Sequence, residues 1–230
     1  MTDDASQMAP SAQMPSSWAM IRTLGSVAVL SGFLIVITVS LTEDRITANR
    51  RRALEDAVFS VLPGAVSRAT FEVTNESFVE VDEPKTGTQV VYAGYDENGN
   101  LVGVAFEASA QGYKDIIRAL FGYSPSEEVI IGYEVLESTE TPGLGDRIAT
   151  DEDFVANFEG LDARLADDGE SLANPITFVR PSEKENPWEV DGISGATVSC
   201  ETVVQMLNTR AQEIIPKIHQ NLDQLQGGGV

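Results

Sequence analysis

The sequence predicts an α+β protein in which one apolar N-terminal helix precedes a domain with an antiparallel sheet and a long C-terminal helix. Three observations support this prediction: an uncharged apolar run at 23–42, two pairs of β-like segments joined by short polar turns, and an apolar stripe of helical period after Thr197. The β-like segments follow one another without a helix between each pair. An antiparallel sheet is therefore expected rather than a series of βαβ units.

The run at 23–42 is the first predicted element. Twenty residues of helix span a bilayer core of about 30 Å, so we expect a single transmembrane helix. A cleaved signal peptide is the alternative, but its apolar part usually has only about 7–15 residues, and no A-x-A-like site follows. Trp18 stands where an interfacial aromatic residue is expected. Residues 1–22, rich in Ser, Met, Ala, Gln and Pro, predict a disordered tail.

A cofactor domain is predicted over 43–225, with a flexible tail at 226–230. Its first helix is expected from about residue 46 to Pro63-Gly64, with Leu54, Ala57, Val58 and Val61 on one side.

Residues 116–123 fit either a strand or a short helix. The turns at 96–100 and 124–128 predict hairpins. Strands are expected at 71–81, 90–95, 101–106, 116–123, 129–136 and 175–179, and short helices and connections at 151–174.

The long C-terminal helix is predicted from residues at spacings of three and four, namely Val204, Leu207, Ala211, Ile214 and Ile218. The turn Asp191-Gly192-Ile193-Ser194-Gly195-Ala196-Thr197 therefore lies at a helix N-terminus, where unpaired N–H groups and the helix dipole favour an anion such as phosphate. Gly192 and Gly195 are expected to adopt positive φ and to allow close approach. The alternative is that Thr197 is only an N-cap, although no Glu or Gln stands three residues later to complete a capping box.

Composition excludes several kinds of site. The chain has one Cys, Cys200, and one His, His219. Iron–sulfur clusters, c-type haem and structural zinc each need more such ligands, and an internal disulfide needs two cysteines. The net charge of −21 excludes a nucleic-acid surface and favours solubility or a basic partner. If the protein carries electrons, we expect an organic cofactor, with Cys200 as a small buried side chain.

Two motifs resemble those of the RnfG and NqrC family. In the first, D-x-[ST]-G-A-T, the last Thr carries FMN through a phosphoester; here Asp191, Ser194, Gly195, Ala196 and Thr197 match it. The second is the family's E-T-P-G-L-G block, which matches Glu140, Thr141, Pro142, Gly143, Leu144 and Gly145. The resemblance implies that this second block is a wall of the flavin site. Leu144 is then expected against the ring, with Thr141 and residues 143–145 near its polar edge.

Other segments are weaker parts of the resemblance. Gly112-Tyr113 resembles a pair found in the family at this place, and Phe154 and Phe158 are the nearest counterparts of an aromatic-rich segment. Trp188 lies close enough to Asp191 in the sequence either to cover a ring or to fill the core.

The resemblance implies an electron-transfer subunit of a membrane-bound, ion-translocating ferredoxin:NAD oxidoreductase of the Rnf type, with no catalytic residue of its own and no metal. Its FMN would be attached to Thr197 by an ApbE-type flavin transferase that uses FAD and Mg²⁺. Its partners would be membrane and iron–sulfur subunits. The alternatives are an NqrC-like subunit of a Na⁺-translocating NADH:quinone reductase and a membrane-anchored flavin sensor or accessory module. A purely structural acidic domain capped by Thr197 is a third. Gly145 followed by Asp146, and the modest length, favour the RnfG type.

Two arguments about orientation disagree. Arg22 precedes the apolar run, whereas Arg45, Arg50, Arg51 and Arg52 follow it, so the positive-inside rule would keep the domain in the cytoplasm. The resemblance implies the outer, periplasmic side of the cytoplasmic membrane, and we adopt that expectation.

Overall fold

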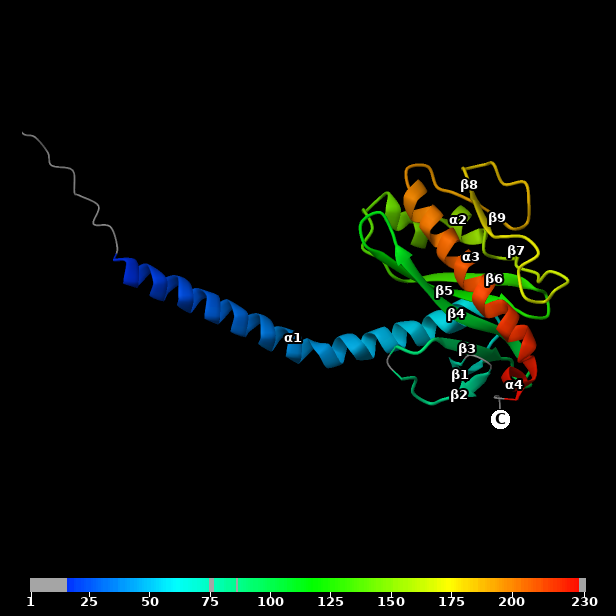
Figure 1. The fold of residues 1–230 in the computed structure, drawn as a ribbon, viewed down its shortest axis with the longest axis horizontal. Helices are drawn as coiled ribbons and strands as arrows, with labels where there is room; N and C mark the ends of the chain where they lie inside the picture. Colours follow the sequence, from blue (N-terminus) through cyan, green and yellow to red (C-terminus); the bar gives the residue numbers. More distant parts are fainter. Residues whose placement is uncertain (1–15, 75–76, 86, 228–230) are drawn as a thin grey trace, which may run out of the picture. The chain divides into compact units, whose positions relative to one another are not determined.

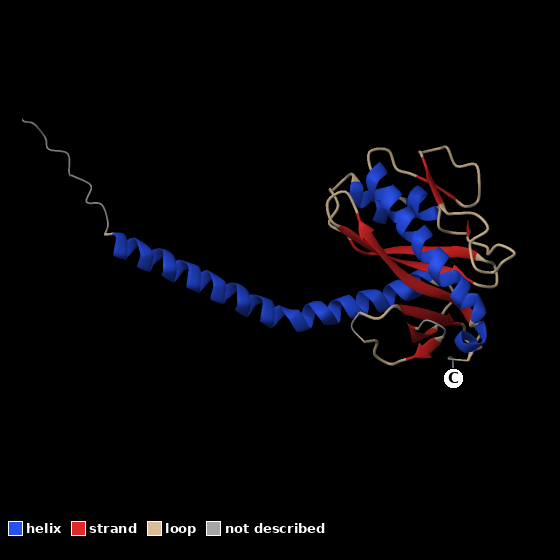
Figure 2. Ribbon diagram, in the orientation of Figure 1, coloured by secondary structure: helices blue, strands red, loops and turns tan. Residues whose placement is uncertain are grey.

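The computed structural model describes residues 16–74, 77–85 and 87–227 and divides the chain into two units, Met1–Arg51 and Arg52–Val230. The long helix α1 (Ser17–Val61) runs from the first unit into the second (Figure 1). The second unit contains the sheets and the remaining helices (Figure 2). The fold is of the predicted α+β class, with a predominantly antiparallel sheet and a long C-terminal helix.

In the first unit, α1 exposes its apolar side chains, such as Leu30, Phe33 and Ile35. By length and composition it is the one helix among the described residues that could cross a membrane. The helix begins at Ser17, where the Ser16 hydroxyl accepts from the amide of Ala19 at 3.3 Å. Residues 17–22, predicted as tail, are therefore helical, because a serine cap starts the helix ahead of the apolar run. The rest of the predicted tail, 1–15, lies outside the described residues.

In the second unit, seven strands form an antiparallel sheet in the order β2-β1-β3-β4-β5-β6-β7. Residues 116–123 are a strand and not a helix. The single strand predicted at 71–81 is wrong, because the chain reverses there and β1 pairs with β2. The strands are β1 (Ser67–Val73), β2 (Phe78–Glu80), β3 (Val90–Tyr95), β4 (Leu101–Gln111), β5 (Ile116–Ser124), β6 (Val129–Glu137) and β7 (Leu161–Asp162).

Helices cover both faces of this sheet. The whole predicted stripe of helix α3 (Thr197–Gln220) is buried in one core, together with residues such as Phe106 and Phe121. The last turns of α1 are buried in a second core with Ala105 and Leu120. Neighbouring residues of a strand point to opposite faces, so the two cores lie on opposite sides of the sheet. The predicted second helix, from about residue 46, is the end of α1 and stops at Val61, just before Pro63-Gly64.

The remaining elements lie between β6 and the C-terminus. A second sheet pairs β8 (Thr177–Val179) with β9 (Glu189–Asp191), and this pair is parallel. Strand β9 was not predicted, because a three-residue strand shows no periodicity. The short helices are η1 (Gly145–Ala149), a 3-10 helix, α2 (Glu152–Ala156) and α4 (Leu222–Gln226). The segment 192–196 leads from β9 straight into α3 and sets the position of the site.

Candidate cofactor site

Three segments that are distant in sequence meet at the N-terminus of α3. They enclose a pocket of about 340 Å³. One is the β4–β5 hairpin, the second is the loop that leads into η1, and the third is the first turn of α3 with the residues before it. The lining residues are Tyr113, Glu140, Thr141, Leu144, Gly145, Gly195, Ala196, Thr197, Val198 and Ser199. The structure thus brings the two sequence motifs together in one pocket.

Thr197 is the first residue of α3 and is exposed at this pocket. The N-cap is Ala196, and no side chain makes a cap hydrogen bond. The interpretation of Thr197 as an N-cap is therefore wrong, because an N-cap residue precedes the first helical residue. The amide of Cys200 is the first to bond back, to Ala196 O at 3.0 Å. Thr197 thus presents its hydroxyl beside the first N–H groups of the helix, where the dipole favours an anion.

Glu140 connects all three segments through its buried carboxylate. Its Oε2 accepts from the Ser199 hydroxyl at 2.6 Å, and its Oε1 accepts from the amide of Lys114 at 2.9 Å in the β4–β5 hairpin. Burial alone would raise the pKa of Glu140, but the hydroxyl of Ser199 and the hairpin amides more than offset it and lower the pKa. The carboxylate is therefore ionised at neutral pH and already engaged by donors from the protein.

Three glycines shape the site in different ways. Gly195 has φ +86°, as predicted, and a Cβ there would lie 3.4 Å from Leu144 Cδ2. At Gly145, a Cβ would lie 2.7 Å from both Glu140 Oε2 and Ser199 Oγ, so only glycine fits. The positive φ predicted for Gly192 is wrong. Gly192 has no room for a side chain, because the ring of Phe178 lies against its Cα.

The other walls of the pocket are apolar and partly exposed. Tyr113 is 73% exposed, and Leu144 and Val198 are each 49% exposed. Leu144 follows a turn in which its amide bonds Thr141 O at 3.1 Å and Gly143 has φ +75°. Such a turn holds a leucine at its end instead of burying it in the core. These three side chains offer an apolar surface to a planar ring.

Three predicted residues do not line the pocket. The side chain of Asp191 faces the loop before β9, where its Oδ1 accepts from the amides of Glu183 and Lys184, each at 3.1 Å. Its carboxylate thus holds this loop. Ser194 is exposed outside the lining, and Gly143 provides the positive φ of its turn.

The aromatic residues singled out in the sequence are structural. Phe154 and Phe158 are buried with Tyr133, and the Tyr133 and Phe158 rings stack at 4.4 Å between centroids. Trp188 is half-buried and lies outside the pocket lining.

Three lining residues were predicted only weakly or not at all. Tyr113 was noted only as part of a Gly-Tyr pair, and Val198 and Ser199 were not predicted to line the site. Ser199 carries no local signal, because its partner Glu140 is 59 residues away. Val198 also has no distinguishing signal, because successive residues of a helix point in different directions and the next two residues of the same turn are buried.

Comparisons with known proteins identify the family of this domain. Residues 112–212 match the model of the FMN-binding domain, a range that includes every lining residue. The G subunit (RnfG) of the ion-translocating oxidoreductase complex from Methanosarcina acetivorans is 31% identical over 190 residues, which are 83% of this chain and 90% of that protein. The chain belongs to the RnfG family.

Other members and structures agree. RnfG from Vibrio vulnificus is 28% identical over 212 residues, which cover 90% of this chain and 94% of that protein. The crystal structure of Shewanella oneidensis NqrC superposes with a TM-score of 0.58 at 20% identity, covering 78% of this chain and 99% of that one. The crystal structure of the C subunit of the Na⁺-translocating NADH-quinone reductase from Parabacteroides distasonis superposes with a TM-score of 0.60 at 19% identity. The match covers 76% of this chain and 96% of that one. The RnfG and NqrC assignment made from the motifs is confirmed, and the solved structures share the fold.

The residues of the pocket fit an FMN group. Its volume falls in the range of about 300–1,000 Å³ typical of small-molecule sites. A helix N-terminus offers amides to a phosphate, and apolar side chains offer a surface to a ring. Glu140 is the only carboxylate among the lining residues, and it is engaged by the Ser199 hydroxyl and the Lys114 amide.

Proposed function

We propose that this RnfG-family protein is an electron-carrying subunit of an ion-translocating ferredoxin:NAD oxidoreductase, and that FMN is attached to Thr197 by a phosphoester. The observation that supports this most strongly is the exposed hydroxyl of Thr197 at the first turn of α3, inside the pocket that both motifs build. The flavin supplies the redox chemistry when bound. The protein has no catalytic residue of its own in this proposal.

Each part of the pocket has a separate task. The first amides of α3 and its dipole stabilise the phosphate. Tyr113, Leu144 and Val198 orient the ring and exclude water from it. Gly195 has a positive φ and no side chain, so the tether can pass close to the backbone at this position. Because a covalent bond holds the group at a high local concentration, these non-covalent contacts need only orient it.

The attachment needs an external enzyme. The Thr197 oxygen would displace AMP from the FMN phosphorus of FAD and lose its proton. The one lining carboxylate, Glu140, bonds Ser199 and the β4–β5 hairpin, so it is not placed to activate Thr197 as a base. We therefore propose an ApbE-type flavin transferase that uses FAD and Mg²⁺ as a partner. Asp191 and Ser194, which lie outside the pocket, would be read by that transferase or would hold the turn that it recognises.

Two variants test the tether. In Thr197→Ala made together with the transferase, we expect complete loss of the FMN mass from the peptide that contains residue 197, measured by intact-protein and peptide mass spectrometry. Thr150→Ala is the matched control, because it removes an exposed threonine hydroxyl that lies outside the pocket lining, and it should keep the FMN. An unmodified wild-type peptide from the native host would refute the proposal.

We also propose that α1 anchors the protein in the cytoplasmic membrane, with the FMN domain on the periplasmic side and with membrane and iron–sulfur subunits as partners. The exposed apolar side chains of α1 support the anchor, and membership of the RnfG family supports the partners. Protease added outside right-side-out vesicles should digest the domain, whereas inverted vesicles should protect it. Protection in right-side-out vesicles would place the domain in the cytoplasm, as the arginines that flank the apolar run suggest.

The Na⁺-translocating quinone reductase is the second candidate, because the solved NqrC structures share the fold. A gene neighbourhood that encodes ferredoxin-type iron–sulfur subunits favours the Rnf type. A neighbourhood without any multi-span membrane subunit favours the sensor or accessory module.

A further inference from the structure

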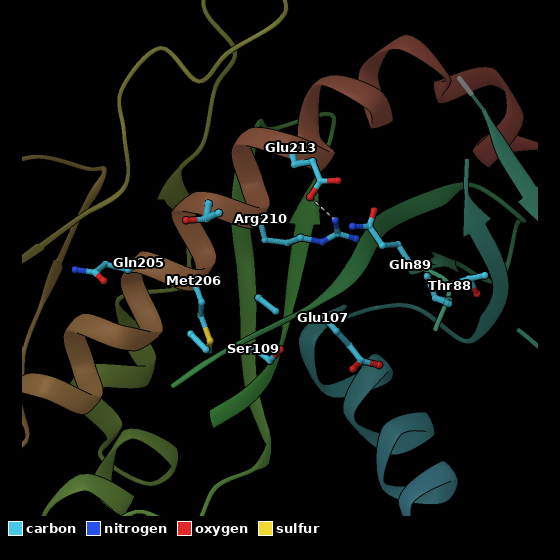
Figure 3. Close-up of a pocket in the computed structure, with 12 residues that line it drawn as sticks. Thr88, Gln89, Glu107, Ser109, Gln205, Met206, Arg210 and Glu213 are labelled. Carbon is cyan, nitrogen blue, oxygen red and sulfur yellow. Dashed lines mark hydrogen bonds and ion pairs between the residues drawn. The ribbon is translucent and has the colours of Figure 1, made fainter. Parts of the chain in front are cut away.

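Two further features of the second unit lie outside the FMN pocket. One is a groove of about 540 Å³ between β4 and α3 (Figure 3). Its charged side chains already have partners within the protein, because Arg210 bonds Glu213 at 2.8 Å and Glu107 bonds Arg118 at 2.7 Å. This groove therefore indicates no particular ligand. The other feature is the buried side chain of Asn157, at the C-terminus of α2.

Strand β9 has a strand partner on one side and Asn157 on the other. Towards β8, the amide of Gly192, just after β9, bonds Val179 O at 3.0 Å. Neighbouring residues of a strand direct their backbone groups to opposite sides, so those of Asp191 point away from β8. There the Asp191 amide donates to Asn157 Oδ1 at 3.1 Å, and Asn157 Nδ2 donates to Asp191 O at 3.4 Å. The Asn157 side chain therefore takes the place of a neighbouring strand at this one residue.

An asparagine suits this position because its side chain carries both an acceptor and donors. Asn157 Nδ2 also donates to Asp153 O at 3.0 Å and to Phe154 O at 3.2 Å, in the last turn of α2. Asn157 Oδ1 also accepts from Lys184 Nζ at 3.1 Å. One buried amide thus joins α2, the loop before β9 and the backbone of Asp191.

The residues between Asp191 and Thr197 are fixed in the same way. Both backbone groups of Asp191 bond Asn157, and its carboxylate accepts from amides of the loop before β9. Ile193 is buried, and the amide of Ala196 bonds Ile193 O at 3.1 Å. The start of this turn is therefore held by Asn157, and its end is closed by a bond within the turn.

We propose that Asn157 is a positioning residue for the attachment of FMN. It holds the backbone of Asp191, so that the turn 192–196 presents Thr197 to the flavin transferase in one conformation. This inference rests on the proposed tether, in which the Thr197 oxygen bonds the FMN phosphorus of FAD, AMP leaves, and the hydroxyl proton is released. A segment that adopts the competent conformation for only part of the time binds with an affinity lowered by that fraction. Asn157 thus acts on the binding of the turn to the transferase.

Initial rates of FMN transfer test this role, measured on the full-length chain in detergent with the transferase, FAD and Mg²⁺. In Asn157→Ala, the KM for this chain should rise by about tenfold, because fewer molecules have the turn in the competent conformation. The kcat at saturation should stay within about twofold of the wild-type value, because the chemical step is unchanged. An unchanged KM in this variant would contradict the proposal.

Asn208→Ala is the matched control. Asn208 Oδ1 accepts from the amide of Ile176 at 2.9 Å, so this variant also loses a bond between an asparagine side chain and the backbone. It leaves the bonds of Asp191 in place and should keep the wild-type KM, with both variants assayed well below their melting temperatures. An equal rise in KM for both variants would show a general loss of stability and would overturn the role of Asn157.

Hydrogen exchange on the chain without FMN gives a second readout that does not depend on the tether. In the wild type, the Asp191 amide should be protected like the Gly192 amide, and an unprotected Asp191 amide would overturn the proposal without any variant. In Asn157→Ala it should exchange at least about tenfold faster, whereas Asn208→Ala should leave it unchanged. Equal exchange in Asn157→Ala and the wild type would also overturn the proposal, even where the tether forms. Faster exchange in Asn157→Ala, with a wild-type chain that takes up no FMN, would refute the tether and not the hold on Asp191.

Discussion

At the scale of single residues, the site depends on one buried carboxylate. Glu140 holds Ser199 of α3 and the amide of Lys114 in the β4–β5 hairpin, so it sets the distance between two walls of the FMN pocket. The side chain that would carry the cofactor, Thr197, takes no part in this network. Glu140 and Ser199 therefore build the site, while the hydroxyl of Thr197, the proposed attachment point, stays outside this hydrogen-bond network.

The pKa of Glu140 predicts a pH dependence. Its pKa in the folded state is lowered from the usual 4.5, so its ionised form stabilises the fold above that pH, and the contribution is lost as pH falls through the folded-state value. We expect Glu140→Gln to lower the free energy of unfolding at pH 7 by about 1–3 kcal/mol, because a charged acceptor of several bonds is lost.

The difference from the wild type should shrink when denaturant unfolding is repeated at pH values below 4.5. Glu201→Gln is the control, since that carboxylate is exposed on the same helix. A difference that stays constant across this pH range would contradict an ionised Glu140.

At the scale of elements, the end of α1 packs directly against glycines of the sheet. Gly122 and Gly132 face each other across β5 and β6, and a Cβ at Gly132 would lie 2.5 Å from Val61 O. Gly94 and Gly103 form a second pair across β3 and β4, where a Cβ at Gly94 would lie 2.7 Å from Leu62 Cδ1. Removing four side chains from this face of the sheet allows the helix end to approach the strands themselves.

We therefore expect Gly122→Ala to destabilise the domain by about 1–3 kcal/mol, because the new methyl group meets the carbonyl of Val61. Gly227→Ala is the control: its φ is −88°, and the nearest heavy atom to its Cβ would be Asp223 O at 3.8 Å. Chemical denaturation of both variants measures the difference. Equal free energies of unfolding for Gly122→Ala and Gly227→Ala would show that the end of α1 can move away from the sheet without loss of stability.

At the scale of the whole molecule, the two units have different surfaces. Apolar side chains of α1 are exposed in the unit Met1–Arg51, whereas the unit Arg52–Val230 buries its apolar residues in two cores. The second of these cores includes the last turns of α1. The division in the structure therefore falls within the helix, and the domain includes helical residues at its own start.

Truncation should reveal this division. We expect a fragment that begins at Arg52 to be soluble and to unfold cooperatively. A fragment that begins at Ala65 loses Val58, Val61 and Leu62, each worth roughly 1.5–3 kcal/mol of burial, and should be much less stable or unfolded. Thermal unfolding by circular dichroism distinguishes the two. Equal melting temperatures would mean that the second core does not depend on α1.

Sequence patterns alone determined the apolar N-terminal helix, the buried stripe of α3, the hairpins around 96–100 and 124–128, and both motifs with Thr197 as the candidate attachment point. Each depends on residues close together in the chain, where helical and strand periods and turn chemistry act. Only the tertiary structure decided that Ala196 and not Thr197 precedes the helix, that Asp191 faces a loop, that Ser199 bonds Glu140, and that β4 extends beyond β3. These features depend on strand register and on contacts between segments distant in sequence, which local patterns do not encode.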